Sequence, residues 1–125
     1  MTEPNYSEDI DKAIAEHALW KQRLRTAIAT GQREFNVAQV RLDNRCEFGK
    51  WFYGLPVTLR ATEQGKRIQA FHTKFHAEVA RILDLLPQGR KEEALKAIAR
   101  GSQYASISAQ LVIALTQWKQ TIGKA

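Results

Sequence analysis

Apolar residues recur every three or four positions along most of this chain, which is the period of a helix with one buried face. The pattern divides the chain into four helical segments separated by glycine and proline. We find no alternating apolar and polar run bounded by turns, so no β-sheet is predicted. The helices are expected over residues 8–30, from residue 43 or 44 through Trp51 and Phe52, over 62–86 and over 91–122.

The ends of these segments carry recognisable helix signals. Ser7 is a candidate N-cap for the first helix, with two acidic residues after it, where the helix dipole favours negative charge. Gly101 lies inside the fourth helix and predicts a small bend, because glycine costs about 1 kcal/mol relative to alanine there. The remaining boundaries are predicted at Gly31, at a cap on Asp43 or Asn44, at Gly54–Pro56, and at Pro87 and Gly89.

Each long segment has a predicted inward face. In the first helix it consists of Ile10, Ile14, His17, Leu24 and Ile28. In the third it consists of Ile68, His72, Phe75, His76, Val79, Ile82, Leu83 and Leu86. In the fourth it consists of Leu95, Ile98, Tyr104, Leu111, Leu115, Trp118 and Ile122. We therefore predict an all-α, antiparallel four-helix bundle, with one short extra helix that carries the cysteine, as one domain over residues 1–125. Residues 32–44 fit either a packed loop or a short helix.

Composition places the chain among soluble globular proteins. Of its 125 residues, 44% are apolar and 26% are charged, and no apolar stretch is long enough for a membrane span. The N-terminus is acidic and polar, unlike a signal peptide. A single cysteine cannot form an internal disulfide. These features predict a cytoplasmic protein, and the polar lead-in after the first methionine favours a stand-alone chain over an excised domain.

The net charge of +6 raises the question of an anionic partner. A nucleic-acid-binding protein would concentrate its basic residues in a patch or stripe. Here they are scattered along the chain, and no run reaches five, so a solvated helical surface explains them more simply. A basic nucleic-acid-binding module, or a metal-free helical protein-interaction module, is the alternative reading of this sequence.

The residues able to bind a metal through nitrogen or sulfur number four, which is the number that tetrahedral zinc requires. They are three histidines and one cysteine: His17, Cys46, His72 and His76. His72 and His76 are four residues apart, so they share one helix face. His17 lies on the inward face of the first helix. Cys46 lies near the start of the short helix, where unpaired backbone N–H groups favour a thiolate.

Each of these observations also has an ordinary structural explanation. A histidine pair at this spacing is often a surface feature, a single histidine on an apolar face is often hydrogen-bonded in the core, and a single cysteine is often buried and inert. The aromatic residues are most simply core. A haemerythrin-like di-iron bundle would need more histidines than three. The residues alone leave the choice between a zinc site and a metal-free bundle open.

Three short motifs resemble those of the chemoreceptor zinc-binding family, the CZB domains. They are "HALWKQRL" at 17–24, "CEFGKW" at 46–51 and "HTKFH" at 72–76. The family pattern is a histidine followed three residues later by tryptophan, then Cys-x-Phe/Leu-Gly-Lys/Arg-Trp, then His-x-x-x-His. All three parts occur in order, and the cysteine motif is the most specific of them.

The resemblance implies a 3His/1Cys zinc site made of His17, Cys46, His72 and His76. It also implies an all-α bundle that forms a homodimer and works as a bacterial sensor, attached to chemoreceptors or to diguanylate cyclases of cyclic-di-GMP signalling. Such modules respond to zinc or, through the cysteine, to hypochlorous acid and related oxidants, which makes Cys46 the redox-sensing residue. No receptor signalling helix or cyclase domain is recognised in this sequence.

A site with three imidazoles and one thiolate leaves no open position on zinc. Hydrolytic catalysis needs a water on the metal, so this ligand set argues against an enzyme. The sequence also contains no nucleophile elbow and no glycine-rich phosphate loop. We therefore expect a regulatory, non-catalytic domain with zinc as its cofactor and no catalytic residues.

Overall fold

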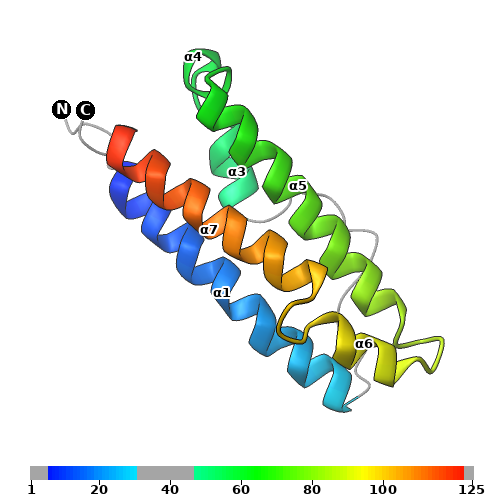
Figure 1. Cartoon of the computed structure of the whole chain (residues 1–125). Helices are drawn as coiled ribbons and strands as arrows, with labels where there is room; N and C mark the ends of the chain where they lie inside the picture. The colour runs from blue at the N-terminus through cyan, green and yellow to red at the C-terminus, as the bar shows by residue number, and fades with distance from the viewer. Residues whose placement is uncertain (1–5, 31–46, 123–125) are drawn as a thin grey trace.

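Three long helices, α1, α5 and α7, form the body of the protein (Figure 1). The computed structural model describes residues 6–30 and 47–122. Its helices are α1 (Tyr6–Thr30), α3 (Glu47–Tyr53), α4 (Val57–Arg60), α5 (Glu63–Asp84), α6 (Lys91–Ala97) and α7 (Gln103–Ile122). Helices α1 and α5 run in the same direction, and α7 packs against both of them in the opposite direction (Figure 1). This arrangement brings the start of α1 next to the end of α7.

Every regular element in the described ranges is a helix, which confirms the predicted all-α bundle. Helix α3 corresponds to the second part of the short helix predicted to start at residue 43 or 44 and to carry the cysteine. Its predicted caps at Asp43 or Asn44, Cys46 itself and the ambiguous stretch 32–44 lie outside the described residues. Within the part of the chain that the structure describes, none of the helices is both long and apolar enough to cross a membrane.

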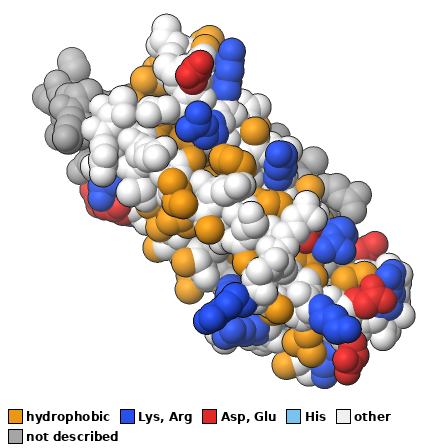
Figure 2. Space-filling view, viewed as in Figure 1, with side chains coloured by type: hydrophobic (Ala, Val, Ile, Leu, Met, Phe, Trp, Pro, Cys, Tyr) orange, Lys and Arg blue, Asp and Glu red, His pale blue; other side chains and the backbone are white. Residues whose placement is uncertain are grey.

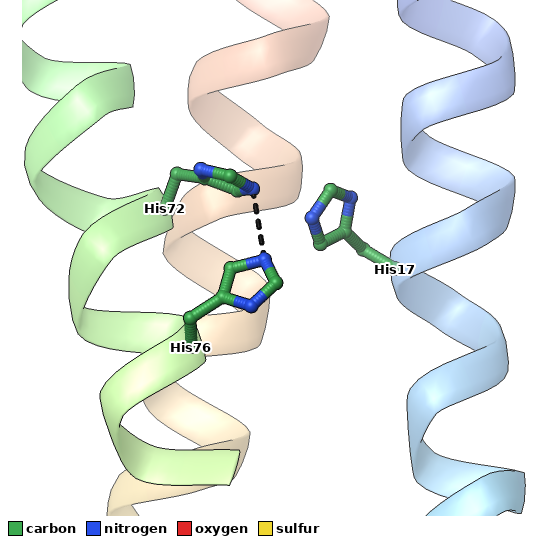
Figure 3. A group of neighbouring side chains, drawn as sticks. All are labelled: His17, His72 and His76. Atoms are coloured by element: carbon green, nitrogen blue, oxygen red, sulfur yellow. Dashed lines mark hydrogen bonds between the residues drawn. The ribbon is translucent and has the colours of Figure 1, made fainter. Parts of the chain in front are cut away.

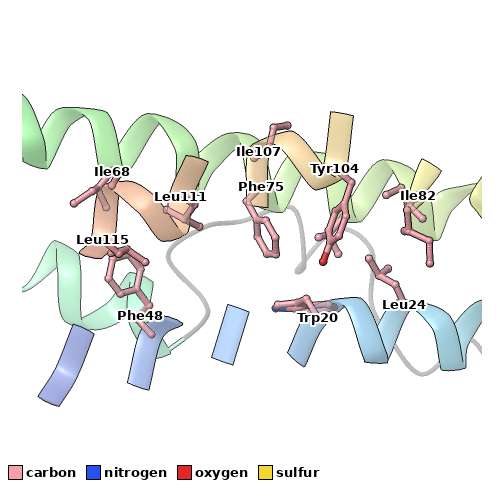
Figure 4. Packing of buried hydrophobic residues seen from close by; sticks show 14 of the residues in the cluster. Trp20, Leu24, Phe48, Ile68, Phe75, Ile82, Tyr104, Ile107, Leu111 and Leu115 are labelled. Atoms are coloured by element: carbon pink, nitrogen blue, oxygen red, sulfur yellow. The ribbon is translucent and has the colours of Figure 1, made fainter. Parts of the chain in front are cut away.

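The core runs along the axis of the bundle, between α1, α5 and α7, and α3 closes one side of it (Figure 4). Its side chains come from the predicted inward faces, because a helical period of 3.6 residues aligns them toward the neighbouring helices. One prediction was wrong, since Leu95 is 46% exposed. The largest fully buried apolar side chains are Ile10, Leu24, Ile28, Phe52, Ile68, Phe75, Ile82, Leu111, Leu115 and Trp118.

The start of α5 is fixed by a side-chain cap and a tight corner. The Thr62 hydroxyl accepts a hydrogen bond from the Gly65 backbone N–H at 3.0 Å, which satisfies one of the unpaired donors of the first turn. A Cβ on Gly65 would lie 2.6 Å from the Leu59 carbonyl oxygen, so α4 and α5 can meet this closely only at glycine. This corner sets where α5, with its two histidines, enters the bundle.

Three boundary predictions need correction. Ser7 lies inside α1, which begins at Tyr6, so it is not the N-cap. The helix predicted over 91–122 is two helices, because the chain leaves helical geometry after Ala97 and Gly101 has a φ of +83°, a conformation that favours glycine. A further one-turn helix, α4, follows Pro56 where only a helix end was expected.

Candidate metal centre

The three histidines come from two helices that lie on opposite sides of the core. His17 projects from the middle of α1, and His72 and His76 project from consecutive turns of α5 (Figure 3). Helix α5 holds its pair on a strongly amphipathic face that packs against α7 and α1. The spacing of four residues places both imidazoles on that face, as the sequence predicts.

The three imidazoles meet in the interior. His17 and His72 are each 2% exposed and His76 is 3% exposed. One nitrogen from each ring takes part in a group whose members all lie within 4.8 Å of one another. The Nε2 atoms of His72 and His76 are 3.1 Å apart. Figure 3 shows the His17 ring directed across the bundle at this pair.

A backbone carbonyl fixes the orientation of the His17 ring. The Nδ1 atom lies 2.7 Å from the Ala13 carbonyl oxygen, one turn earlier on α1. Because a carbonyl only accepts hydrogen bonds, Nδ1 carries the proton and donates it. The Nε2 atom of His17 is then left with its lone pair. This is the arrangement of a metal-binding histidine whose other nitrogen is held by a backbone acceptor.

Burial keeps the His17 and His72 rings uncharged at neutral pH. Loss of solvation lowers the pKa of His17 from its ordinary value of 6.5 to about 4, although the hydrogen bond to Ala13 partly opposes it. Loss of solvation, together with repulsion from His76 and His17, lowers the pKa of His72 to about 2. A neutral imidazole has the free lone pair that a metal needs.

Aromatic rings enclose the cluster. The Phe48 ring of α3 makes edge contacts with His17 and His72, with ring centroids 5.7 and 4.9 Å apart. Phe75 packs edge-on against His17 at 5.2 Å from the other side. The described surroundings are therefore largely apolar, which favours neutral nitrogen ligands.

The donor set fits zinc. Zinc binds imidazole nitrogen at about 2.0–2.1 Å, and tetrahedral ligands at that length lie about 3.3 Å apart. The His72–His76 separation of 3.1 Å is already close to this value. All three ligand nitrogens lie within 4.8 Å of one another, so closing the set to this value would need side-chain movements of about 1–2 Å. The described residues thus supply three ligands of a four-ligand site.

Of the four residues that the sequence singled out, the structure brings three together. Cys46 lies outside the described residues, so its membership of the site stays a prediction. Phe48, two residues further along the chain, touches two of the three histidines.

Comparison with known families gives a direct result. The model of the chemoreceptor zinc-binding domain matches residues 17–83, more than half of the chain. This protein belongs to the chemoreceptor zinc-binding domain family. The matched region begins at His17 and includes Cys46, His72 and His76. Comparisons with curated proteins and with solved structures gave no match.

The sequence did not reveal two groups that contact the histidine cluster. The Ala13 carbonyl is one, and the spacing of one helical turn before His17 is the only signal that could have pointed to it. The Phe48 ring is the other. Only the packing of α3 against α1 and α5 reveals which rings Phe48 touches.

Proposed function

We propose that this domain is a zinc-binding regulatory sensor, with a site formed by His17, His72, His76 and Cys46. One observation carries the proposal: three buried imidazoles converge from two helices in a chain of a zinc-binding family. The contact between His72 and His76 is itself a hydrogen bond, but His17 already has the Ala13 carbonyl as its partner, so hydrogen bonding alone does not explain why its ring joins the pair.

The proposed ligand set gives the domain a regulatory role instead of a catalytic one. Three imidazoles and one thiolate complete a tetrahedral site and leave no position for a reacting water. When bound, zinc would supply a cross-link between separate segments of the chain and would hold Cys46 as the thiolate. The contact of Phe48 with two histidines supports Cys46 as the fourth ligand, because Phe48 follows it by two residues.

Oxidation of Cys46 would couple the site to hypochlorous acid. The thiolate sulfur gives up two electrons and gains the oxygen atom, and chlorine leaves as chloride, so R–S⁻ and HOCl become R–SOH and Cl⁻. A sulfenic acid is a poor zinc ligand, since the thiolate is the form that binds. Loss of the Cys46 bond would free α3, which is seven residues long. Zinc depletion would free the same helix.

The proposed partners follow the family. We propose that the domain occupies residues 1–125, acts in the cytoplasm and controls a chemoreceptor, a diguanylate cyclase or another signalling protein. In that role, movement of α3 would alter a surface that the partner contacts.

A homodimer is part of this proposal, and one face of the molecule supports it. A groove of about 490 Å³ runs between α1 and α7 and is lined by small and apolar residues, among them Ala18, Ala109 and the 56% exposed Ile113. Figure 2 shows hydrophobic side chains exposed over these helices. The charges of α1 are self-complementary, since residues 6–16 are mainly acidic and residues 17–30 carry only basic charges. Two copies of α1 packed antiparallel would pair opposite charges.

Metal analysis tests the site. Protein purified without a histidine tag should contain about one zinc per chain, and adding zinc to metal-free protein should raise its thermal stability, by about 4 kcal/mol at a thousandfold excess over Kd. Metal-free protein whose stability is unchanged by zinc would overturn the proposed site.

Oxidant treatment tests the sensor. Hypochlorous acid should change the zinc content or helicity of the native protein and leave the Cys46→Ala variant unchanged. Equal responses in the two proteins would overturn the role of Cys46. The dimer is tested separately by sedimentation: Ile113→Asp should yield monomer, whereas the control Val57→Asp, at a 67% exposed position on α4, should not. A dimer that survives Ile113→Asp would exclude this face.

A further inference from the structure

A second cavity lies next to the histidine cluster, between α1 and α3. It has a volume of about 280 Å³, which is room for about nine water molecules. Its walls are Asp9, Lys12, Ala13 and Glu16 from one face of α1, and Phe48 and Trp51 from α3. Lys12 is exposed, so the cavity reaches the protein surface.

Two of these wall residues also touch the histidine cluster from its outer side. The Ala13 carbonyl accepts the hydrogen bond of His17 at 2.7 Å, and the Phe48 ring contacts both His17 and His72. The cavity and the cluster therefore share a wall that is one residue thick. Ala13 contributes a backbone group held within α1, whereas Phe48 contributes a side chain that can change rotamer.

The residues around this wall explain why Phe48 is the barrier. Its ring is only 3% exposed although it lines the cavity, so the ring fills the space between the water-accessible cavity and the imidazoles. Its helix is short, and its ring also contacts the rings of Trp51 and Phe52 on the same helix. Movement of this one ring would connect the cavity with the site.

We propose that the α1–α3 cavity is the passage by which zinc enters and leaves the histidine site, and that the Phe48 ring is the gate that closes it. This inference rests on the proposed zinc site and adds how the site exchanges its metal. Among the described residues, the cavity rim carries two carboxylates, on Asp9 and Glu16, and one ammonium group, on Lys12.

A gate has a kinetic signature that a ligand or a purely structural residue lacks. Because a gate alters only the barrier, its removal speeds zinc binding and zinc release by the same factor and leaves Kd unchanged. Damage to the site instead speeds release and weakens Kd together. The ratio of the two rates therefore separates a gate from a packing defect.

The experiment compares three variants of α3 by stopped-flow transfer of zinc to and from a chromogenic chelator. Phe48→Ala should speed both rates by about tenfold or more, a change of about 1.4 kcal/mol in the barrier. Phe48→Leu, which keeps an apolar side chain in the gap, should lie between this variant and the native protein. Phe52→Ala is the matched control, since Phe52 is 2% exposed on the next turn and its ring contacts are with Phe48, Tyr53 and Trp118.

The control removes the main competing explanation. If Phe48→Ala acts only by loosening α3, then Phe52→Ala will speed exchange equally, and the gate is overturned. A Kd for Phe48→Ala that weakens in proportion to the faster release also overturns it. Circular dichroism of each variant shows whether it folds, and Phe48→Leu provides the test if the alanine variant does not.

A second readout needs no metal. Diethyl pyrocarbonate modifies accessible imidazoles, and mass spectrometry locates the modified residue. In metal-free protein, Phe48→Ala should raise the modification rate of His17 by about tenfold, with little change in Phe52→Ala. Unchanged reactivity would overturn the passage. If the native protein binds no zinc but Phe48→Ala still raises the modification rate of His17, the proposed zinc site is wrong and the access route is still supported.

Discussion

Helices α5 and α3 both line the histidine cluster, but the fold holds them in very different ways. Helix α5 has 22 residues and packs along α7 and α1, with Ile68, Phe75 and Val79 fully buried. Helix α3 has seven residues, and two phenylalanines, Phe48 and Phe52, are its largest buried side chains. The His72–His76 pair is therefore preorganised by a long, well-packed helix, whereas α3 is a short helix whose described contacts with the bundle include several between aromatic rings.

The largest expected difference between the two helices is in stability. Phe75→Ala should lower the free energy of unfolding by about 3–5 kcal/mol, since it empties a fully buried site in the centre of the bundle. Phe52→Ala should cost less, because α3 can detach while α1, α5 and α7 stay folded. Urea denaturation of the metal-free variants measures both. Equal costs would show that α3 is as integral to the fold as α5.

The next largest effect concerns the ligands on α5. His72→Ala should weaken zinc binding by more than about 100-fold, the upper end of what losing an outer-shell partner costs. Lys74→Ala, at an exposed position two residues away, is the control and should bind zinc as the native protein does. Competition with a chelator of known affinity gives both values. If His72→Ala binds zinc with native affinity, His72 is not a zinc ligand.

Acid should destabilise the metal-free protein before its carboxylates titrate. The pKa values of His17 and His72 fall from 6.5 in the unfolded chain to about 4 and about 2 in the fold. Below pH 6.5 the unfolded chain therefore binds more protons, so stability is full above pH 6.5 and declines as the pH falls toward 4. The slope is about 1.4 kcal/mol per pH unit for each histidine.

Denaturation at several pH values between pH 7 and pH 4.5 measures how steeply the free energy of unfolding changes with pH. The double variant His17→Gln/His72→Gln is the control, because glutamine does not titrate. A variant with the same slope as the native protein would show that other groups cause the acid sensitivity.

The smallest expected effect is the most local. Removal of zinc should speed amide hydrogen exchange by a larger factor in α3 than in the middle of α5, because local opening follows the number of contacts that hold a segment. Mass spectrometry of peptides from the two helices measures this. Equal changes in both would mean that the metal stabilises the bundle as one unit, and the contrast between the helices would disappear.

The sequence predicted the long helices well and the junctions poorly. Periodicity located α1 and α5 to within about two residues at each end, and it located the end of α7, because burial repeats along all of their length. It could not distinguish a bent helix from two helices at Gly101, since glycine is compatible with both. It also placed Leu95 in the core, although Ala94 is the buried residue at that point of α6.

By itself, the sequence determined that the protein is helical, that His72 and His76 share a face, and that the only other nitrogen or sulfur ligands are His17 and Cys46. Only the tertiary structure decided that His17 meets the pair, that the Ala13 carbonyl sets its tautomer, and that Phe48 separates the cluster from a surface cavity. The physical reason is that spacing fixes a residue's position on its own helix. Which faces meet depends on how the helices rotate and pack against one another.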